Sequence, residues 1–452
     1  MNIAPYPTYQ PSGVEWLGNI PKDWSVKRLK WSVDGCFNGV WGDEPDGIDD
    51  VVCLRVADFN RDNYTISTEA LTLRAIEAKQ LESRKLKRGD LLIEKSGGGE
   101  KQLVGCVVYF DHEFDAVCSN FVARMPVAEG HLPRYWAYVH AGLYAGKLNY
   151  PAIKQTTGIQ NLDAALYLDT LAAYPPLAEQ QQIAAFLDWK TSQIDALIAK
   201  KQALLQKLKE KRLAVITQAV TKGLNPDAPM RDSGSDWIGK VPSHWDVLKI
   251  KFVTELASGH TPSRTVEEYW IDCNIPWVSL NDSKMLREKD SISETHYQIS
   301  ELGLANSSAR LLPAGVVVFS RDATVGLCAI TEVPMAVSQH FVAYICGEKI
   351  TGKYLLFVLK AMNQHLQSLQ TGSTIVTIGM PEVRGLICPL PTTVEQAAIV
   401  DHIDSVTAKI DQMLANAEIA ITCLTEYRSA LITAATTGKI DVRGWQAPQE
   451  TV

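Results

Sequence analysis

Two stretches of the chain carry the hydrophobic spacing of long helices. In the later stretch, one row of residues recurs every seven positions, and a second row follows it three positions on. The two rows are Ile403, Ile410, Ala417, Leu424 and Leu431, and Val406, Met413, Ala420, Tyr427 and Ala434. Two apolar rows with a seven-residue repeat are typical of helices that pack along one another. We therefore predict a long spacer helix over residues 391–440.

A similar but less regular stretch lies in the first half of the chain. Its row of residues is Leu187, Ile194, Lys201, Leu208 and Val215. The lysine interrupts the row, but the spacing still predicts a first spacer helix over residues 175–224. At 1.5 Å per residue, roughly 40 residues give a rod on the order of 60 Å, too long to bury its apolar face against one small domain. The two helices are therefore expected to pack together as an antiparallel, coiled-coil-like pair.

The segments before each helix show short apolar runs, glycines and aromatic residues, a pattern typical of a mixed sheet with small helices. The fold class is therefore predicted as α+β. We expect two pseudo-repeated domains of mixed α and β structure, over residues 1–174 and 225–390, to alternate with the two helices, and residues 441–452 to form a tail.

The chain is an internal duplication. The spacing Trp-x-Gly-x-x-Pro-x-x-Trp at residues 16–24 recurs 221 positions later, at residues 237–245. Further blocks correspond in the same order, and each helix begins near a Glu-Gln pair. The paired blocks are residues 86–93 with 312–319, 104–105 with 325–326, 119–123 with 339–343, and 179–180 with 395–396. Trp16 and Trp24 of the first domain recur in the second domain as Trp237 and Trp245. Because both domains keep the same two tryptophans, we expect these side chains to have a packing role.

Composition narrows the class of protein. With 452 residues, 46% hydrophobic and 21% charged, the chain is expected to form two or more globular domains. No apolar run is long enough for a membrane span, and the first residues do not resemble a signal peptide, so a cytoplasmic location is predicted. The nine cysteines include no CxxC pair and are interpreted as reduced core residues, so that neither a metal nor a cofactor is expected.

The net charge of −7 argues against a nucleic-acid binder unless cations cluster locally. The first helix carries such a run, interrupted only by Glu210: Lys200, Lys201, Lys207, Lys209, Lys211 and Arg212. Such a run is usually a solvated face. The alternatives are a surface for the DNA backbone or for an acidic partner.

The candidate DNA contacts of the first domain lie in two polar loops. Glycines in the first loop permit close approach to phosphates, and cations, hydroxyls and amides supply donors. The candidates are Lys95, Ser96, Gly97, Lys101 and Gln102 in the first loop, and Lys154, Thr156, Thr157 and Gln160 in the second. The alternative is that they form a solvated hairpin and a Thr/Gly-rich turn.

The second domain offers corresponding loops. The candidates there are Arg321, Asp322 and Thr324 in the first loop, and Ser373, Thr374 and Thr377 in the second. Arg321 has the donors to bond a guanine edge or a phosphate. For the pairs at residues 119–120 and 339–340, a structural role and DNA contact are equally compatible with the pattern.

The duplicated plan, the repeated tryptophan motif and the Glu-Gln pair at each helix start together resemble one family. The chain resembles the specificity subunit of a Type I restriction-modification system over nearly its whole length. The resemblance implies that each domain recognises one half of a bipartite double-stranded DNA target and that the helices fix the gap. It also implies two copies of an adenine-N6 methyltransferase subunit and an ATP-dependent restriction subunit as partners.

The resemblance further implies that this chain has no catalysis of its own. Neither a GxxxxGK[ST] phosphate loop nor an Asn/Asp-Pro-Pro-aromatic methyltransferase motif occurs in the sequence. Two other classes remain as alternatives: an enzyme whose motif is not recognisable, and a scaffold whose domains bind proteins instead of DNA.

Overall fold

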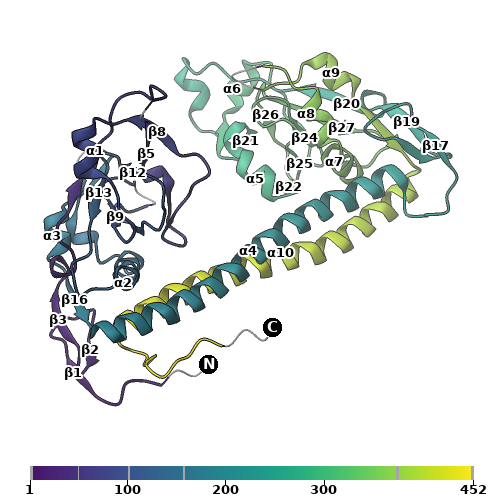
Figure 1. Cartoon of the computed structure of the whole chain (residues 1–452). Coiled ribbons are helices and arrows are strands. Elements are labelled where there is room, and N and C mark those ends of the chain that lie inside the picture. Colours follow the sequence, from purple (N-terminus) through teal and green to yellow (C-terminus); the bar gives the residue numbers. More distant parts are fainter. Residues whose placement is uncertain (1–3, 49, 100–101, 156–157, 373–375, 449–452) are drawn as a thin grey trace. The chain divides into compact units, whose positions relative to one another are not determined.

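The computed structural model describes residues 4–48, 50–99, 102–155, 158–372 and 376–448. The chain folds into two compact units (Figure 1). Unit 1 comprises residues 1–202 and 418–452, and unit 2 comprises residues 203–417. There are two long helices, α4 (Leu177–Lys222) and α10 (Thr393–Thr436). Each of them contributes one part to unit 1 and the other part to unit 2.

Unit 1 contains several small sheets. The central one has the order β11-β9-β13-β4, and a neighbouring one has the order β12-β5-β8, with β12 parallel to β5. The strands of these two sheets are β4 (Phe37–Asn38), β5 (Asp50–Leu54), β8 (Thr72–Ala75), β9 (Leu91–Glu94), β11 (Val107–Tyr109), β12 (Ala116–Cys118) and β13 (Val122–Met125). The pairs β1 (Tyr9–Pro11) with β2 (Asn19–Pro21), β3 (Ser25–Arg28) with β16 (Leu171–Tyr174), and β6 (Phe59–Asn60) with β7 (Thr65–Ile66) complete the frame.

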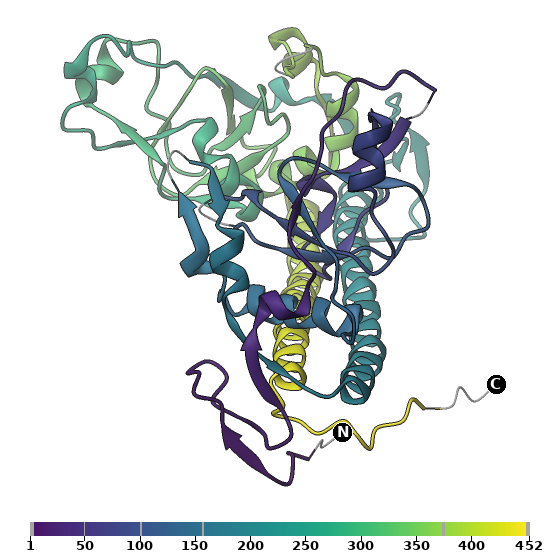
Figure 2. The same cartoon turned by 60° about the vertical axis from the view of Figure 1, so that its left-hand side comes forward.

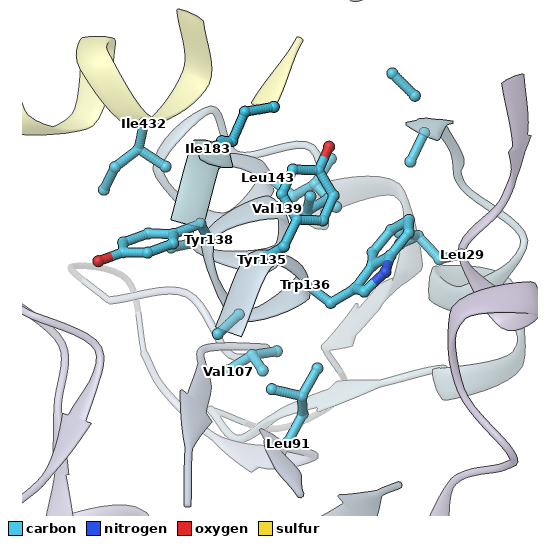
Figure 3. Packing of buried hydrophobic residues seen from close by; sticks show 14 of the residues in the cluster. Leu29, Leu91, Val107, Tyr135, Trp136, Tyr138, Val139, Leu143, Ile183 and Ile432 are labelled. Atoms are coloured by element: carbon cyan, nitrogen blue, oxygen red, sulfur yellow. The ribbon is translucent and has the colours of Figure 1, made fainter. Parts of the chain in front are cut away.

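The core of unit 1 surrounds helix α2 (Pro133–Ala145) (Figure 3). Proline occupies the first helical turn, where its missing N–H costs nothing, and nearly every residue after it is buried. Trp136 and Tyr135 pack in the same cluster as Leu91 of β9, Ile183 of α4 and Ile432 of α10. The domain core of unit 1 is therefore continuous with its portions of the two long helices. The small helix α3 (Ala164–Leu168) contributes Tyr167 and Leu168 to this core, whereas α1 (Ala78–Arg84) has no buried residue.

Unit 2 repeats this plan with a five-stranded sheet of order β20-β27-β24-β25-β22 and a three-stranded sheet of order β23-β21-β26. Their strands are β20 (Thr254–Ser258), β21 (Ile275–Val278), β22 (Ser291–Ile292), β23 (Tyr297–Ile299), β24 (Val317–Ser320), β25 (Cys328–Thr331), β26 (Ala336–Val337) and β27 (Phe341–Cys346). The pairs β17 (Met230–Asp232) with β18 (Lys240–Pro242) and β19 (Asp246–Lys249) with β28 (Ile387–Leu390) match the two outer pairs of unit 1.

The core of unit 2 is built around helix α7 (Gly352–Ala361), which buries six consecutive residues from Tyr354 to Leu359. Ile216 of α4 and Ile399 and Ile403 of α10 belong to the same cluster. The remaining helices are α5 (Ser283–Glu288), α6 (Glu301–Ala305), α8 (Asn363–Ser368) and α9 (Met380–Gly385). In unit 2, as in unit 1, one buried helix therefore joins the sheet to the long helices.

The repeated tryptophan motif holds a hairpin against the end of a long helix in each unit. In unit 1, the hairpin of β1 and β2 lies near the C-terminal end of α10 (Figure 2). Lys439 Nζ donates to the carbonyl oxygens of Leu17 and Asn19, at 2.7 and 2.6 Å. In unit 2, Lys222 Nζ donates to the equivalent carbonyls of Ile238 and Lys240. Trp24 and Trp245 are almost fully buried, and Trp16 and Trp237 pack against the two cores, which confirms the packing role.

One part of the predicted helix pattern is wrong. The row that begins at Ile403 is largely buried, but Met413 and Tyr427 of the second row are 54% and 52% exposed. The inner face instead includes residues four positions after each member of the first row, such as Thr407 and Arg428. The hydrophobic pattern did not predict this buried row, because the row includes polar residues, which the pattern places on the solvent-exposed face.

Three further properties concern the described residues as a whole. None of their helices is both long and apolar enough to cross a membrane. All nine cysteines are free. No group of three or more His, Cys, Asp or Glu side chains among these residues is arranged to hold a metal ion.

Candidate nucleic-acid interface

The two candidate loops of the first domain lie side by side in unit 1. Strand β10 (Ser96–Gly97) pairs with β15 (Gln160–Leu162), which in turn pairs with β14 (Ile153–Gln155). Asn161 is the register partner of both Ser96 and Lys154. Loops that are far apart in the sequence therefore form one small antiparallel sheet.

The candidate loops of the second domain meet in the same way within unit 2. Thr377 forms isolated β-bridges with both Asp322 and Thr371. The Thr377 hydroxyl also donates a hydrogen bond to the Asp322 carboxylate. The structure thus brings together Asp322 and Thr377, as it brings together Ser96 and Asn161 in unit 1.

Main-chain hydrogen bonds define which residues of the two units are equivalent. The Lys95 N–H donates to the Phe121 carbonyl at 2.7 Å, and the Arg321 N–H donates to the His340 carbonyl at 2.9 Å. The Lys95 carbonyl accepts from Leu162, and the Arg321 carbonyl accepts from Ile378. Lys95 and Arg321 therefore occupy the same place in the two copies of the frame.

The strand register corrects one sequence pairing by one residue. Val122 lies opposite Glu94, the last residue of β9, and Phe341 lies opposite Ser320, the last residue of β24. Residues 119–123 therefore correspond to residues 338–342 rather than to 339–343. The error arose because phenylalanine occurs in both segments, but it is exposed at Phe121 and buried at Phe341.

This equivalence defines one edge in each unit. Edge 1 consists of Asn38, Lys95, Ser96, Asn120, Phe121 and Asn161. Edge 2 consists of their equivalents Ser258, Arg321, Asp322, Gln339, His340 and Thr377. Four of the six positions carry a different type of side chain in the two units, although the main chain that presents them is the same. The other two positions keep a cation, Lys95 or Arg321, and an amide, Asn120 or Gln339.

Edge 1 presents a cation, an aromatic ring and amides. Lys95 Nζ donates to Asn38 Oδ1 at 2.5 Å, and Ser96 Oγ donates to Asn161 Oδ1. The Phe121 ring is 60% exposed, and Asn120 is also exposed. These groups can contact phosphates, sugars or base edges, and Phe121 adds an apolar surface.

Edge 2 is a more tightly connected polar cluster. The Arg321 guanidinium donates to the carbonyls of Gln339 and Ile378 at 3.2 and 3.4 Å, and it lies 3.6 Å from the Asp322 carboxylate. His340 Nδ1 lies 2.9 Å from that carboxylate. Asp322 is thus surrounded by partners and is itself 9% exposed, so it positions Arg321 and His340.

Some candidate residues shape the loop of unit 1 from inside. The Gln160 side chain is buried, accepts from the Val104 N–H at 3.0 Å and donates to the Gly99 carbonyl at 3.2 Å. Gly97 has φ of +143°, and a Cβ there would lie 2.8 Å from the Glu94 carboxylate. The Gln102 side chain lies against the Arg61 guanidinium. With the amide oxygen of Gln102 turned towards Arg61, it accepts hydrogen bonds from the guanidinium.

Glu94 is a buried carboxylate directly behind edge 1. Burial raises its pKa above the ordinary value, while Arg61, whose Nη2 lies 2.9 Å from Glu94 Oε1, acts in the opposite direction. Its equivalent Ser320 is fully buried too but carries no charge. Only edge 1 therefore has an ionisable group in this supporting position.

The remaining candidates are less constrained. Lys154 Nζ bonds Asp163 at 2.8 Å, a contact that lowers the pKa of this carboxyl. The half-buried Thr324 shares a hydrogen bond with Ser320 at 3.0 Å. Five candidates lie outside the described residues: Lys101, Thr156, Thr157, Ser373 and Thr374.

Sequence reasoning missed Asn38, Phe121 and Ser258 as members of the edges. One signal was available, because Gly39 and Gly259 directly follow Asn38 and Ser258. A Cβ at either glycine would lie within 2.5 Å of main-chain atoms of the adjacent strand end. This repeated close approach brings Asn38 and Ser258 next to their edges.

Comparison with solved structures identifies the fold. The chain superposes on a subunit from a study titled "Structural basis underlying complex assembly and conformational transition of the type I R-M system", with a TM-score of 0.70 and 14% identity, over 93% of this chain and 99% of that one. The HsdS subunit from Thermoanaerobacter tengcongensis gives a TM-score of 0.51, also at 14% identity, over 93% and 98% of the two chains. The fold is therefore that of subunits of Type I restriction-modification systems.

Sequence comparison shows which proteins the chain is similar to. Residues 242–420 match the model of the Type I restriction modification DNA specificity domain. The MjaIX specificity subunit of Methanocaldococcus jannaschii is 34% identical over 36% of this chain, a stretch that spans 38% of that relative's own length. The StySPI specificity subunit of Salmonella potsdam is 24% identical, with 81% of this chain and 78% of the relative covered. The chain is a relative of the Type I specificity subunits, which are non-catalytic DNA-recognition subunits, and the resemblance inferred from the repeats is confirmed.

Proposed function

We propose that this chain is a DNA specificity subunit that recognises a bipartite double-stranded target, with edge 1 and edge 2 each contacting one half-site. The observation that carries this proposal is the contrast between frame and side chains. Equivalent main-chain hydrogen bonds hold Lys95 and Arg321 in place, yet the neighbouring side chains differ. A scaffold that must recognise two different base sequences requires this combination, because base edges are distinguished by donor and acceptor patterns.

In this proposal the recognition domains are residues 1–174 and 225–390, and the spacer helices lie within residues 175–224 and 391–440. The two helices form an antiparallel, coiled-coil-like spacer, and residues 441–452 are a tail. A spacer of fixed length makes half-site separation a geometric quantity, because a shift of one base pair along B-DNA also rotates the target around the duplex. Changing the helix length should therefore alter the gap and leave both half-sites unchanged.

The chemistry is proposed to reside on partner chains. Two copies of an adenine-N6 methyltransferase subunit and an ATP-dependent restriction subunit would act at the site that this chain selects. The relatives support this division, because they are named as specificity subunits of Type I restriction enzymes. A cytoplasmic location follows from the proposed DNA target.

The remaining candidates keep a place in this proposal according to their surroundings. Lys95, Ser96 and Arg321 are proposed to contact DNA directly. Gly97, Gln160 and Asp322 are proposed to fix the shape of the loops that do so, since their polar groups or close contacts are directed into the protein. Lys154, Gln102, Thr324 and Thr377 would form the margin of the contact surface.

The test is to co-express the chain with its cognate methyltransferase subunit and map methylated adenines across the host genome. The expected result is a single bipartite motif with a fixed gap that disappears when this chain is omitted. Methylation that is unchanged without the chain would overturn the proposal. In a parallel assay, methyl transfer or magnesium-dependent DNA cleavage by the purified chain alone would contradict the non-catalytic role.

A further inference from the structure

A hollow next to edge 2 is lined by aromatic side chains and one arginine. It has a volume of about 290 Å³, and its walls are Arg264, Trp270, Trp277 and Tyr297. We call it the aromatic hollow. A second hollow of about 390 Å³ shares Arg264 and Trp277 with it and reaches Gln339 and His340 of edge 2. The aromatic hollow is therefore connected to edge 2 through side chains that the two hollows have in common.

Hydrogen bonds to main-chain carbonyls hold the two tryptophans of the aromatic hollow in place. Trp277 of β21 lies opposite Tyr297 of β23 in the sheet. Its indole N–H donates to the His260 carbonyl at 3.2 Å, and that of Trp270 donates to the Ser263 carbonyl at 3.1 Å. The two indole rings meet edge to face, with centroids 5.8 Å apart. Trp277 is only 2% exposed and forms the floor of the hollow, so the surfaces left for a ligand are the rings of Trp270 and Tyr297 and the Arg264 guanidinium.

The fold does not require aromatic residues at these positions. Ser119 and Ser338 donate equivalent main-chain bonds to Leu54 and Val278, which makes Cys53 the counterpart of Trp277. The strand partner of Cys53 is Thr72, so Thr72 is the counterpart of Tyr297. Unit 1 therefore builds the same sheet with small side chains, and the aromatic pair is specific to unit 2.

Near the corresponding sheet of unit 1, the ring of Trp41 is covered by an arginine of the same unit. Arg74 lies over the Trp41 ring at 4.4 Å and pairs with Glu44 at 2.7 Å. Trp41 thus has a cation from its own domain on its face. In unit 2, by contrast, Tyr297 is 43% exposed and Arg264 is also exposed, so the aromatic hollow is open.

We propose that the aromatic hollow receives a nucleobase that leaves the stack of the bound duplex at the half-site of unit 2. The proposal rests on the proposed DNA-recognition function and adds a binding site to it. Aromatic rings stack on the face of any base, and the planar guanidinium of arginine does the same. Gln339 and His340, between the hollow and the rest of edge 2, supply donors and acceptors for the edge of the displaced base.

The experiment uses the full-length chain without partners and the duplex that it enriches from a random pool. Each position of the second half-site is mismatched in turn by changing one strand only. Because a mismatch removes part of the cost of unpairing, we expect one mismatch to tighten binding by about 10-fold, while the others weaken it. Tyr297→Ala and Arg264→Ala should abolish this gain, whereas Tyr297→Phe should keep it because the ring remains.

Matched controls separate the site from the fold and from the general function. Thr72→Ala, at the position in unit 1 equivalent to Tyr297, should leave the gain unchanged, and thermal unfolding should show that all variants are folded. If mismatches weaken binding at every position, or if the gain persists in Tyr297→Ala, the proposed base site is wrong while DNA recognition stands. If no duplex is enriched at all, DNA recognition by the isolated chain fails, and the base site fails with it.

Discussion

Edge 1 and edge 2 are two solutions built on one main-chain frame. In edge 1, the Lys95 side chain bonds one amide oxygen, and its main chain bonds Phe121, whose ring is exposed. In edge 2, Arg321 contacts two carbonyls and a carboxylate that also contacts His340. The difference shows that the main-chain hydrogen bonds that build the frame are separate from the side chains that we propose to contact DNA. Side chains at the edge can therefore change without cost to the frame.

Replacing a whole domain should produce the largest effect on this comparison. If residues 1–174 are exchanged for the corresponding domain of another specificity subunit, the first half-site of the methylation motif should change completely. The second half-site and the gap should stay as they are, because edge 2 and the helices are untouched. Genome-wide mapping of methylated adenines measures all three. A change in both half-sites would show that the edges are not independent.

The next prediction concerns two equivalent ion pairs of the long helices. In unit 1, Arg428 pairs with Asp195 at 2.9 Å, is only 4% exposed and also donates to the Asn63 carbonyl. In unit 2, Arg212 pairs with Asp411 at 2.9 Å, but both side chains are partly exposed. Arg428→Ala should therefore lower the free energy of unfolding by about 1.5–3 kcal/mol, because it removes the charge-assisted hydrogen bonds of a nearly buried guanidinium, while Asp195, which is 35% exposed, can be hydrated.

Arg212→Ala is the matched control, and its expected cost is about 0.5 kcal/mol, typical of an exposed pair. Urea denaturation followed by circular dichroism measures both variants. Equal losses would mean that burial does not distinguish the two pairs.

Arg428 also shows where the sequence was insufficient. The duplication, the two long helices and the mixed character of the domains could be predicted, because periodicity and repeated motifs are local signals. The inner face of α10 could not, since Thr407 and Arg428 are polar, and their burial depends on partners such as Asp195 that lie far away in the sequence. A hydrophobic pattern alone favoured the wrong neighbouring row, which includes the exposed Tyr427.

The candidate site was predictable in part for a similar reason. Polar loops and glycines indicated Lys95 and Arg321, but no local signal shows that Asn161 and Thr377 pair with those loops. Strand pairing over such distances depends on the tertiary fold. The burial of Gln160 likewise follows from two main-chain contacts that the sequence does not reveal.

Single substitutions at the edges should give smaller, distinct effects on DNA binding. Arg321→Ala should weaken binding to the cognate duplex by about 1–3 kcal/mol and relax base preference in the second half-site, if the guanidinium contacts a base. Lys95→Ala should weaken binding to all sequences about equally and lower the slope of log affinity against log salt by about 1, as expected for a phosphate contact.

Fluorescence anisotropy at several salt concentrations, with duplexes altered in one half-site at a time, separates these two outcomes. Arg321→Lys is the conservative control, because it keeps the charge but loses the planar donor group. A change of preference in the first half-site caused by Arg321→Ala would contradict the assignment of edge 2 to the second half-site.

The smallest expected effect distinguishes Glu94 from Ser320. Burial holds the pKa of Glu94 above its ordinary value of 4.5, so the folded unit binds this proton more tightly than the unfolded chain does. The tighter binding of this proton stabilises the folded protein fully when the pH is below the ordinary pKa of Glu94. This contribution to the free energy of unfolding is lost as the pH rises through the pKa of Glu94 in the folded protein. Glu94→Gln should therefore gain stability relative to the unmodified protein as the pH rises from 4.5 towards neutrality.

The measurement is the difference in urea midpoint between Glu94→Gln and the unmodified protein at a series of pH values. Ser320→Ala, at the equivalent position of unit 2, should show a difference that does not vary with pH, because no charge is removed. The Arg61 guanidinium opposes the effect, since it stabilises the ionised carboxylate of Glu94. If the variant instead loses stability as the pH rises, the ion pair with Arg61 outweighs burial, and edge 1 is supported by a charge that edge 2 does without.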